Sequence, residues 1–418
     1  MRKPLFLCLA LAALFLLAWD AHRWYEGRAA REPAFRSRAT ANELSGWQDS
    51  RQRWRLSAAE ITRTDDGVDA TGIGEGLLQR DGAAPLHFSA PQASYRKKNG
   101  LLRFSAGVSF VLDGKSLQVA DGVYNDKAQS FHGSGVLFAN GPESPSRWEV
   151  RAAGITYSHD GKQWQLKKEV SVKWHSTAGG HPCALATPLL ILDEAFSGAV
   201  MPEPVALAGG PLSGAAANAY WDGDILTLHR VELRDERWAA ALTAGTAARS
   251  GDKWVFAGGV AIRRDNGDAW RADRLELADG SAVYLENAAG TIGAVAFRAE
   301  KLLSDDRENY RTVGAVSVRP REDATLAADR LTFAERDERY FLDKPRLKQD
   351  NGTEISADTG LYDATRRSVT FTANVVTVRS DGREIRAAKA VYDLDSRVAE
   401  YSGAVRTVRH TGGEGEDR

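Results

Sequence analysis

The residues of this sequence that could do acid–base chemistry are carboxylates in close pairs. The pairs considered are Asp222 with Asp224, Asp265 with Asp268, and Asp305 with Asp306. Cleavage of a polysaccharide needs two carboxyl groups held across a cleft, with the pKa of one of them raised by burial. The first two pairs lie beside turn glycines, where Asp is favoured because its side chain hydrogen-bonds the backbone. We therefore interpret these two pairs as turn residues.

Other catalytic, metal-binding and nucleotide-binding patterns are incomplete. Gly114–Ser116 resembles the end of a phosphate-binding loop, but position 109 is Ser where that loop requires Gly. The glycines of Gly72–Gly76 are not followed by a helical pattern, which a dinucleotide site requires. The eight histidines show no metal-ligand spacing, and His181–Cys183 is interpreted as a loop. We expect no catalytic residue, no metal site and no cofactor, and thus a protein that is not an enzyme.

The charge balance argues against a nucleic-acid partner. The 418 residues include 55 Lys and Arg and 56 Asp and Glu, with a net charge of −1, whereas binding to phosphates requires a basic surplus on one face. The two cysteines, Cys8 and Cys183, are implausible disulfide partners because Cys8 lies inside an N-terminal apolar run. The fold must therefore be held by packing, and the chain is long enough to bury a large core.

Alternating apolar residues predict strands. Residues at every second position would share one face in two segments: Phe104, Ala106, Val108, Phe110 and Leu112, and then Val369, Phe371, Ala373 and Val375. Dipeptides that suit two-residue hairpin turns recur between such segments. These Asp-Gly and Asn-Gly pairs begin at Asp66, Asp81, Asn99, Asp113, Asp160, Asp222, Asn266, Asn351 and Asp381. No long helical pattern with caps follows position 40, so the predicted fold class is all-β.

Related segments recur along the chain. Phe104–Asp126, Phe256–Asp279 and Phe371–Asp395 each join an alternating strand through a turn to a second strand with small central residues. Within each half, similar strands recur at a spacing of roughly 27–35 residues, which is typical of stacked units that bury their apolar faces against their neighbours. The sequence therefore predicts stacked antiparallel strands around a continuous interior.

An apolar run near the N-terminus predicts a membrane anchor. Arg2 and Lys3 precede 15 uncharged residues, Leu5–Trp19, a length between that of a signal-peptide core and that of a spanning helix of about 20 residues. No clear small-x-small cleavage site follows the run. We therefore expect residues 1–20 to be an uncleaved transmembrane helix, with a cleaved signal peptide as the alternative. In both cases the body of the chain is exported.

Composition along the rest of the chain predicts two modules. Residues 21–45 are charged and poor in large apolar residues, as a tether would be. We expect a first β-module at 46–175, a Gly/Ala/Pro-rich junction at 176–216 with a short helix around Leu189–Phe196, and a second β-module at 217–410. The tail, 411–418, is expected to be disordered.

Two segments of the second half, Ser356–Gly382 and Ile385–Val408, resemble the OstA-like modules of the lipopolysaccharide transport system. In those modules an A-x-x-x-x-Y-D pattern leads through a turn into G-x-V-x-V. Ala357–Asp363 and Ala387–Asp393 match the first part, and Gly403 begins the second part, with Val405 matched and Thr407 in place of the last Val. The first half repeats the pattern more loosely at 120–125 and 133–138.

Together with the anchor, the chain resembles the LptC-type, membrane-anchored periplasmic component of that system. It is about twice as long as a single-module member, so it resembles a tandem or an LptC–LptA-like fusion. The resemblance implies two β-jellyroll modules in the periplasm on an inner-membrane anchor. It also implies a carrier that passes lipopolysaccharide from the permeases of an inner-membrane ABC transporter to a periplasmic β-jellyroll bridge protein.

A lipid carrier needs an unbroken apolar interior, because exposing an acyl chain of a dozen carbons to water costs about 10 kcal/mol at about 0.8 kcal/mol per methylene. We predict that inward apolar residues line this interior. In the first module they are Phe104, Val108, Phe110, Leu117, Val119, Phe131, Val136 and Phe138, and in the second Leu331, Phe333, Val369, Phe371, Val375 and Val391. The terminal strands, near Trp54–Thr62 and Tyr401–Val408, are expected to have free edges that partner modules could extend.

Two other functions are compatible with the sequence. An anchored β-repeat scaffold or adhesin of the cell envelope would explain the repeats and the anchor without a lipid. A polysaccharide-active enzyme on a stacked β-fold would instead use carboxylates such as Asp224 or Asp268.

Overall fold

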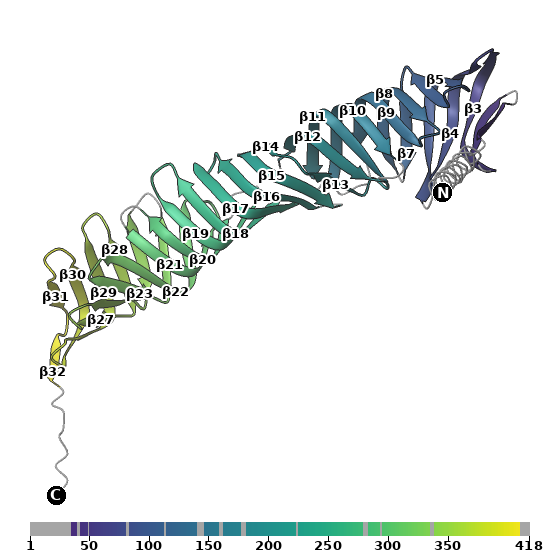
Figure 1. The fold of residues 1–418 in the computed structure, drawn as a ribbon. Coiled ribbons are helices and arrows are strands. Elements are labelled where there is room, and N and C mark those ends of the chain that lie inside the picture. The colour runs from purple at the N-terminus through teal and green to yellow at the C-terminus, as the bar shows by residue number, and fades with distance from the viewer. Residues whose placement is uncertain are drawn as a thin grey trace, which may run out of the picture. The chain divides into compact units, whose positions relative to one another are not determined.

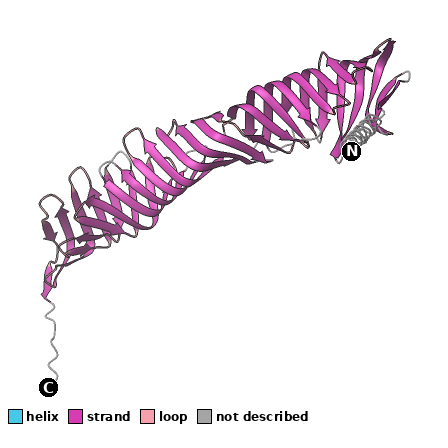
Figure 2. Ribbon diagram, in the orientation of Figure 1, coloured by secondary structure: helices cyan, strands magenta, loops and turns pink. Residues whose placement is uncertain are grey.

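The computed structural model describes residues 35–39, 42–48, 50–80, 83–112, 114–139, 146–158, 162–176, 181–222, 225–278, 283–292, 295–334 and 338–409. These residues form 32 β-strands and no helix (Figure 2), which confirms the all-β prediction. The expected anchor, residues 1–20, and the expected tail, residues 411–418, lie outside the described residues. The described part of the chain contains no apolar helix that could cross a bilayer.

The chain divides into two compact units. Unit 1 comprises Met1–Phe138 with Ala153–Trp164, and unit 2 comprises Ala139–Ala152 with Gln165–Arg418. This division precedes the predicted junction at 176–216, which instead contains strands of unit 2. The helix expected near its centre is wrong, because every second residue at the start of Cys183–Asp193 is buried and the segment extends as a strand.

Nine strands belong to unit 1, and two of them, β1 and β2, begin within the expected tether. They are β1 (Phe35–Ala39), β2 (Glu43–Gln48), β3 (Arg51–Thr64), β4 (Gly67–Arg80), β5 (Ala83–Arg96), β6 (Leu101–Ser105), β7 (Val108–Leu112), β8 (Lys115–Asn125) and β9 (Ser130–Ala139). The last residue of β9, Ala139, already belongs to unit 2, and two further strands, β10 (Ser146–Ser158) and β11 (Gln163–Ser176), carry residues of both units.

The remaining strands belong to unit 2. The first eleven are β12 (Cys183–Asp193), β13 (Gly198–Met201), β14 (Val205–Gly209), β15 (Leu212–Asp222), β16 (Ile225–Asp235), β17 (Ala240–Ser250), β18 (Lys253–Arg264), β19 (Ala269–Ala278), β20 (Val283–Ile292), β21 (Val295–Ser304) and β22 (Asn309–Arg321). The last ten are β23 (Ala324–Ala328), β24 (Arg330–Ala334), β25 (Arg339–Asp343), β26 (Arg346–Gln349), β27 (Glu354–Ser356), β28 (Thr359–Asp363), β29 (Ser368–Val378), β30 (Arg383–Asp393), β31 (Ala399–Ser402) and β32 (Arg406–Arg409).

Within each unit the chain runs as an antiparallel meander, in which each strand pairs with the strands before and after it (Figure 1). Some strands are divided in two. β6 and β7, for example, both pair with β5 on one side and with β8 on the other. The chain therefore crosses the sheet each time either as one long strand or as two short strands in line. Hairpin turns of a few residues connect them.

A bend with left-handed backbone conformation occurs near the middle of many crossings. Residues with positive φ at these bends include Gly72, Ala106, Gly107, Gly135, Arg230, Gly258, Gly259, Asn287, Gly314, Lys344, Ala373, Asn374 and Gly403. The pairing registers shift at several of them, for example between Thr372 and Val375 of β29. These are β-bulges, in which an additional residue bends the strand. They recur with the period of the sequence repeat.

The strict alternation of buried and exposed residues that the sequence predicts is interrupted at the bulges. Ala106 and Ala373 were predicted to face the interior, but both are exposed. Each has a positive φ, of 66° and 65° respectively, so it lies in the bulge as the inserted residue. The inward pattern resumes beyond it, and Phe371 and Val375 are both buried. The bulge thus keeps apolar residues inside on both sides of the bend.

The repeated Tyr-Asp motif ends a strand and begins a turn. Tyr362 and Tyr392 are buried, each 3% exposed, while the following aspartates accept backbone hydrogen bonds. Asp363 Oδ1 accepts from the amide of Arg366 at 2.9 Å, and Asp393 Oδ1 accepts from the amide of Ser396 at 2.7 Å. The motif therefore couples an aromatic anchor in the core with an Asx-type turn.

The two predicted strand edges differ. Among the described strands, β31 and β32 pair only with β30, which agrees with the edge expected near Tyr401–Val408. The edge expected near Trp54–Thr62 is wrong for its first part, because Trp54 pairs with Gly46 of β2 as well as with Leu78 of β4, whereas Glu60–Thr62 pair only with β4 among the described strands. The two strands that precede β3 were not anticipated, since their segment has few large apolar residues.

Candidate functional site: an open groove and a filled interior

Thirteen of the fourteen predicted interior residues lie in the core. Phe104, Val108, Phe110, Leu117, Val119, Phe131, Val136 and Phe138 of unit 1 and Leu331, Phe333, Val369, Phe371 and Val375 of unit 2 are each at most 4% exposed. Val391 is the exception, since it is only partly buried and its neighbours Ala390 and Tyr392 are the buried residues. The side-chain alternation of β30 therefore runs in the opposite phase to the one predicted.

The aromatic rings of unit 1 interlock. Phe110 lies edge-to-face on Phe131, with ring centroids 5.2 Å apart, and both rings contact Trp164 at 5.8 and 6.0 Å. Phe104 joins the same cluster through Phe88 at 5.4 Å. A cavity of only about 20 Å³ remains beside Phe131 and Trp164, less than the volume of a methylene chain. The predicted interior of unit 1 is therefore filled by its own side chains.

Unit 2 has a comparable row of rings. Trp270, Tyr310, Phe333, Tyr340 and Tyr362 follow one another with centroid distances of 5.2 to 5.5 Å. Such contacts stabilise each pair by about 0.5–1.5 kcal/mol beyond the burial of their area. The last four rings lie directly opposite one another on the paired strands β22, β24, β25 and β28, so the row connects these strands within the core.

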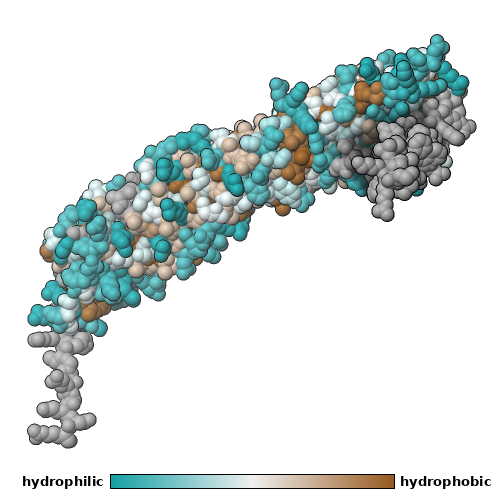
Figure 3. All heavy atoms as spheres, viewed as in Figure 1, coloured by the Kyte–Doolittle hydropathy of each residue, from teal (hydrophilic) through white to brown (hydrophobic). Residues whose placement is uncertain are grey.

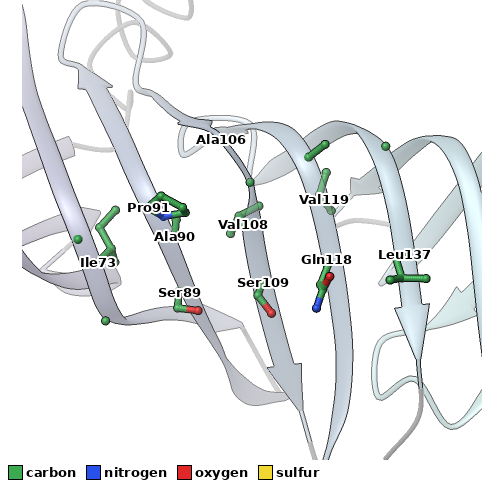
Figure 4. Close-up of a pocket in the computed structure, with 15 residues that line it drawn as sticks. Ile73, Ser89, Ala90, Pro91, Ala106, Val108, Ser109, Gln118, Val119 and Leu137 are labelled. Carbon is green, nitrogen blue, oxygen red and sulfur yellow. The ribbon is translucent and has the colours of Figure 1, made fainter.

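Open space in unit 1 lies along the line of bulges rather than between the aromatic rings. A groove of about 730 Å³, here called the unit-1 groove, crosses β4, β5, β7, β8 and β9 (Figure 4). Its lining consists of Gly72, Ile73, Gly74, Ser89, Ala90, Pro91, Ala106, Gly107, Val108, Ser109, Gln118, Val119, Ala120, Gly135 and Leu137. Its volume lies within the range of about 300–1,000 Å³ that is typical of small-molecule sites.

Small residues at the bulges explain why the groove is open. Gly135 has a φ of 64°, and a Cβ atom there would lie 2.8 Å from the Cβ of Ala120. Gly74 differs, since a Cβ atom at that position would meet no atom within 4 Å and would project into free space. The accessible surface of the groove comes from exposed small residues such as Pro91, Ala106 and Ala120, because the adjoining core residues Ile73, Val108 and Val119 are only 3%, 3% and 1% exposed.

The groove offers mainly apolar contact with a few polar groups. Ser109 and Gln118, on the neighbouring strands β7 and β8, pair across the sheet and supply a hydroxyl and an amide. None of the residues lining the groove is charged. An apolar chain could thus lie against the exposed prolyl and alanyl groups while a polar group met Ser109 or Gln118.

The carboxylate pairs considered for catalysis have other partners. Asp265 forms an ion pair with Arg234, with 2.6 Å between Oδ2 and Nη2, and Asp268 is buried and accepts from the side-chain amide of Asn266 at 2.9 Å. Asp306 accepts backbone hydrogen bonds from Asn309 and Glu308, which lower its pKa to about 2. Asp224 lies outside the described residues. Asp268 and Asp306 therefore stabilise their own turns, and Asp265 connects its turn to Arg234.

The remaining sequence candidates do not come together as a reactive site. Cys183 is buried at the start of β12 beside Gly209, and His181 is exposed next to Arg237. Among the residues that the structure describes, no group of three or more His, Cys, Asp or Glu side chains could hold a metal ion.

A buried polar network in unit 2 was not predicted from the sequence. Arg307 Nη1 lies 2.8 Å from Asp235 Oδ2, and both side chains are at least nine-tenths buried. The indole nitrogen of Trp238 donates to the hydroxyl of Tyr310 at 2.8 Å, and that hydroxyl donates to the carbonyl of Arg307 at 2.9 Å. The partners are 72 residues apart in sequence, so no local pattern could have paired them. The network joins two neighbouring turns.

Comparison with protein-family models and with curated proteins finds no match. Among solved structures, the chain is similar to LptH of Pseudomonas aeruginosa, described as the LptA-homologous periplasmic component of the conserved lipopolysaccharide transport device. The similarity covers 34% of this chain and 95% of LptH, at 15% sequence identity and a TM-score of 0.18. The function of the chain is therefore argued from its own residues.

Proposed function

We propose that the chain is a non-enzymatic lipid carrier whose unit-1 groove binds an acyl chain. The groove supports this proposal because it is open to solvent and lined largely by small apolar residues, so that a hydrocarbon chain placed there would lie on the exposed residues Pro91, Ala106 and Ala120. Each methylene removed from water would stabilise the complex by about 0.8 kcal/mol. The uncharged lining adds no desolvation cost for a buried charge.

The sequence favours lipopolysaccharide as the lipid and the periplasm as the location. Its OstA-like patterns and its N-terminal apolar run, Leu5–Trp19, together support an inner-membrane anchor with an exported body. In this proposal the chain receives lipid from the permeases of an ABC transporter. It passes the lipid to a β-jellyroll bridge protein that adds to the free edge of β31 and β32, which pair on one side only among the described strands.

The filled interior limits where the lipid can bind. Phe110, Phe131 and Trp164 contact one another directly, so an acyl chain between them would have to separate rings whose contacts are favourable. The groove requires no such separation. We therefore place the acyl chain in the groove and treat the aromatic cluster as the structural core.

The same filled interior favours a second candidate, an anchored envelope scaffold with no lipid ligand. A scaffold needs a stable, closed β-structure and free edges for assembly. It does not need an accessible apolar groove. The two candidates therefore differ in whether hydrocarbon contacts the groove.

Photo-crosslinking from one strand tests the proposal. A photoreactive residue at Ser109 of β7 would lie in the groove, whereas one at Val111, two residues along the same strand and 45% exposed, does not line it. With purified lipopolysaccharide we expect adducts at position 109 at least tenfold above those at position 111. Equal labelling at the two positions, or none in a protein with wild-type circular dichroism, would favour the scaffold.

A further inference from the structure

Four arginines lie on the outer face of unit 2, the face that points away from the core. They are Arg263 of β18, Arg271 of β19, Arg298 of β21 and Arg319 of β22, and all four are exposed. Their cross-strand neighbours are small. Arg263 pairs with Ala241 and Ala269, Arg271 with Ala261 and Ala289, and Arg298 with Ala289 and Ser317.

No carboxylate neutralises these arginines within the part of the chain that the structure describes. The acidic residues nearest to them have other partners or lie elsewhere on the face. Asp265, two residues beyond Arg263, forms an ion pair with Arg234. Asp273 accepts from the side-chain amide of Asn287 at 2.6 Å, and the carboxylate of Glu300 lies over Gly314 at the bulge of β22. Glu232 lies three strands from Arg271, with Thr243 and Ala261 between them. The four charges thus face solvent together.

The other half of the same strands is different. Beyond the bulges, Glu276 of β19 forms ion pairs with Lys253 of β18 and Arg274 of its own strand, and these cations lower the pKa of Glu276 against the opposing effect of its burial. In the next strand, β20, the hydroxyl of Tyr284 donates to the carboxylate of Glu286 at 2.8 Å. Charges are therefore balanced on one half of this outer face and unbalanced on the other.

The register arranges the arginines as two diagonal pairs. Arg263 opposes Ala269, two residues before Arg271, and Arg319 opposes Ala296, two residues before Arg298. Neighbouring strands are about 4.8 Å apart, so the two pairs lie about 15 Å apart across the sheet. A depression of about 540 Å³ separates Arg263 from Arg271, and its floor includes Ala261, Ala269 and Ala289. The alanines leave room for a group between the guanidinium groups.

We propose that this outer face binds the phosphate groups of an anionic lipid head group. Guanidinium groups bind phosphate oxygens with two parallel hydrogen bonds, and their fixed planar geometry suits this ligand better than an ammonium would. Two arginine pairs would hold two phosphates. The choice of a lipid as the source of the phosphates rests on the proposed function, whereas the preference for phosphate rests on the arginines alone.

Vesicle binding by the full chain tests the inference. The double variant R271Q/R298Q removes one charge from each pair, and R274Q is the matched control, because Arg274 lies on the same strand as Arg271 but is paired with Glu276. Each arginine near an anionic surface contributes about fivefold to binding, so we expect the double variant to bind phosphatidic-acid vesicles about thirtyfold more weakly at low salt. The control and the wild type should bind equally, and binding should weaken at high salt.

Two outcomes would overturn the proposed phosphate site, and a third would overturn the proposal that the phosphates belong to a lipid. Equal vesicle binding by the wild type and the double variant, with circular dichroism unchanged, would show that the arginines form no phosphate site. A weakening by R274Q as large as that of the double variant would show a nonspecific charge effect. Free pyrophosphate that competes as well as vesicles at equal phosphate concentration would overturn the lipid source. Crosslinking at position 109 is a separate readout, so a failed groove leaves this result unaffected.

Discussion

At the scale of single residues, each unit contains a buried carboxylate in a different electrostatic setting. Asp235 of unit 2 is paired with Arg307, whereas Asp126 of unit 1 is fully buried beside Tyr95 and Trp54, with no salt bridge to a basic side chain among the described residues. Burial raises the pKa of Asp126 to about 6, because favourable interactions with Tyr95, Trp54 and Lys127 only partly offset the loss of hydration. The two aspartates therefore respond differently to substitution.

The raised pKa of Asp126 predicts a pH-dependent stability. The folded state holds a proton on this group up to about pH 6, and the unfolded chain releases it near the ordinary value of 3.8. Because the folded state binds more protons in this window, the free energy of unfolding falls as the pH rises from about 4 to about 6. Asp126→Asn should therefore stabilise the protein by about 1–3 kcal/mol at pH 7.5, and by much less at pH 4.

Urea denaturation monitored by tryptophan fluorescence at both pH values would measure this difference. A variant whose stability differs from that of the wild type by the same amount at pH 4 and pH 7.5 would show that Asp126 does not titrate in this range.

The buried ion pair predicts a different response in unit 2. Arg307→Met would leave the Asp235 carboxylate buried without its cation, and the loss of one partner of such a pair typically costs about 3–5 kcal/mol. The double variant Arg307→Met with Asp235→Asn removes both charges and should recover part of that loss. Thermal unfolding of the three proteins checks this order. A single variant as stable as the double variant would contradict a strong interaction between the two side chains.

At the scale of elements, strands and turns could be predicted from the sequence but the bulges could not. Apolar residues at every second position indicate a strand, and an Asp-Gly pair indicates where the strand ends, and both signals are local in the sequence. A bulge interrupts the alternation without a distinctive residue, since Ala106 and Ala373 occupy left-handed positions that glycine would favour. The misassigned Val391 on β30, the strand that pairs with β29 across the bulge at Ala373, shows the same limit, because the phase of a strand depends on its partners.

The groove was missed for a related reason. Its lining combines glycines and alanines from five strands, and small residues carry no signal for a binding site when read one strand at a time. The interior residues were found because burial follows hydrophobicity. Whether they enclose space or fill it depends on how rings from different strands meet, as Phe110 and Trp164 do, and only the folded chain determines that.

The bulge glycines predict a stability difference between two positions that bound the groove. Gly135→Ala should cost about 1–2 kcal/mol, because its φ of 64° is left-handed and the new Cβ would lie 2.8 Å from that of Ala120. Gly74→Ala should be neutral or slightly stabilising, since its new Cβ would meet no atom within 4 Å. Thermal unfolding compares them, and an equal loss at both positions would contradict the assigned role of the bulge.

At the scale of the whole molecule, the chain combines an apolar groove in unit 1 with a cationic face in unit 2. Its exposed large apolar residues, such as Val111, Tyr220 and Phe341, come from different strands. On the face shown in Figure 3, hydrophobic residues lie in small groups among hydrophilic ones. A carrier of an amphipathic lipid needs one surface for hydrocarbon and another for charged groups, and each unit supplies one of them.

Lipid binding after the groove is filled tests this account most directly. Gly74→Trp would place an indole in the open space beside Ile73, while Gly74→Ser, at the same position, leaves most of that space free. We measure the binding of a fluorescent acyl-chain lipid to the full chain. The account predicts at least a tenfold loss of affinity for the Trp variant and wild-type affinity for the Ser variant. Wild-type affinity in a correctly folded Gly74→Trp protein would contradict it.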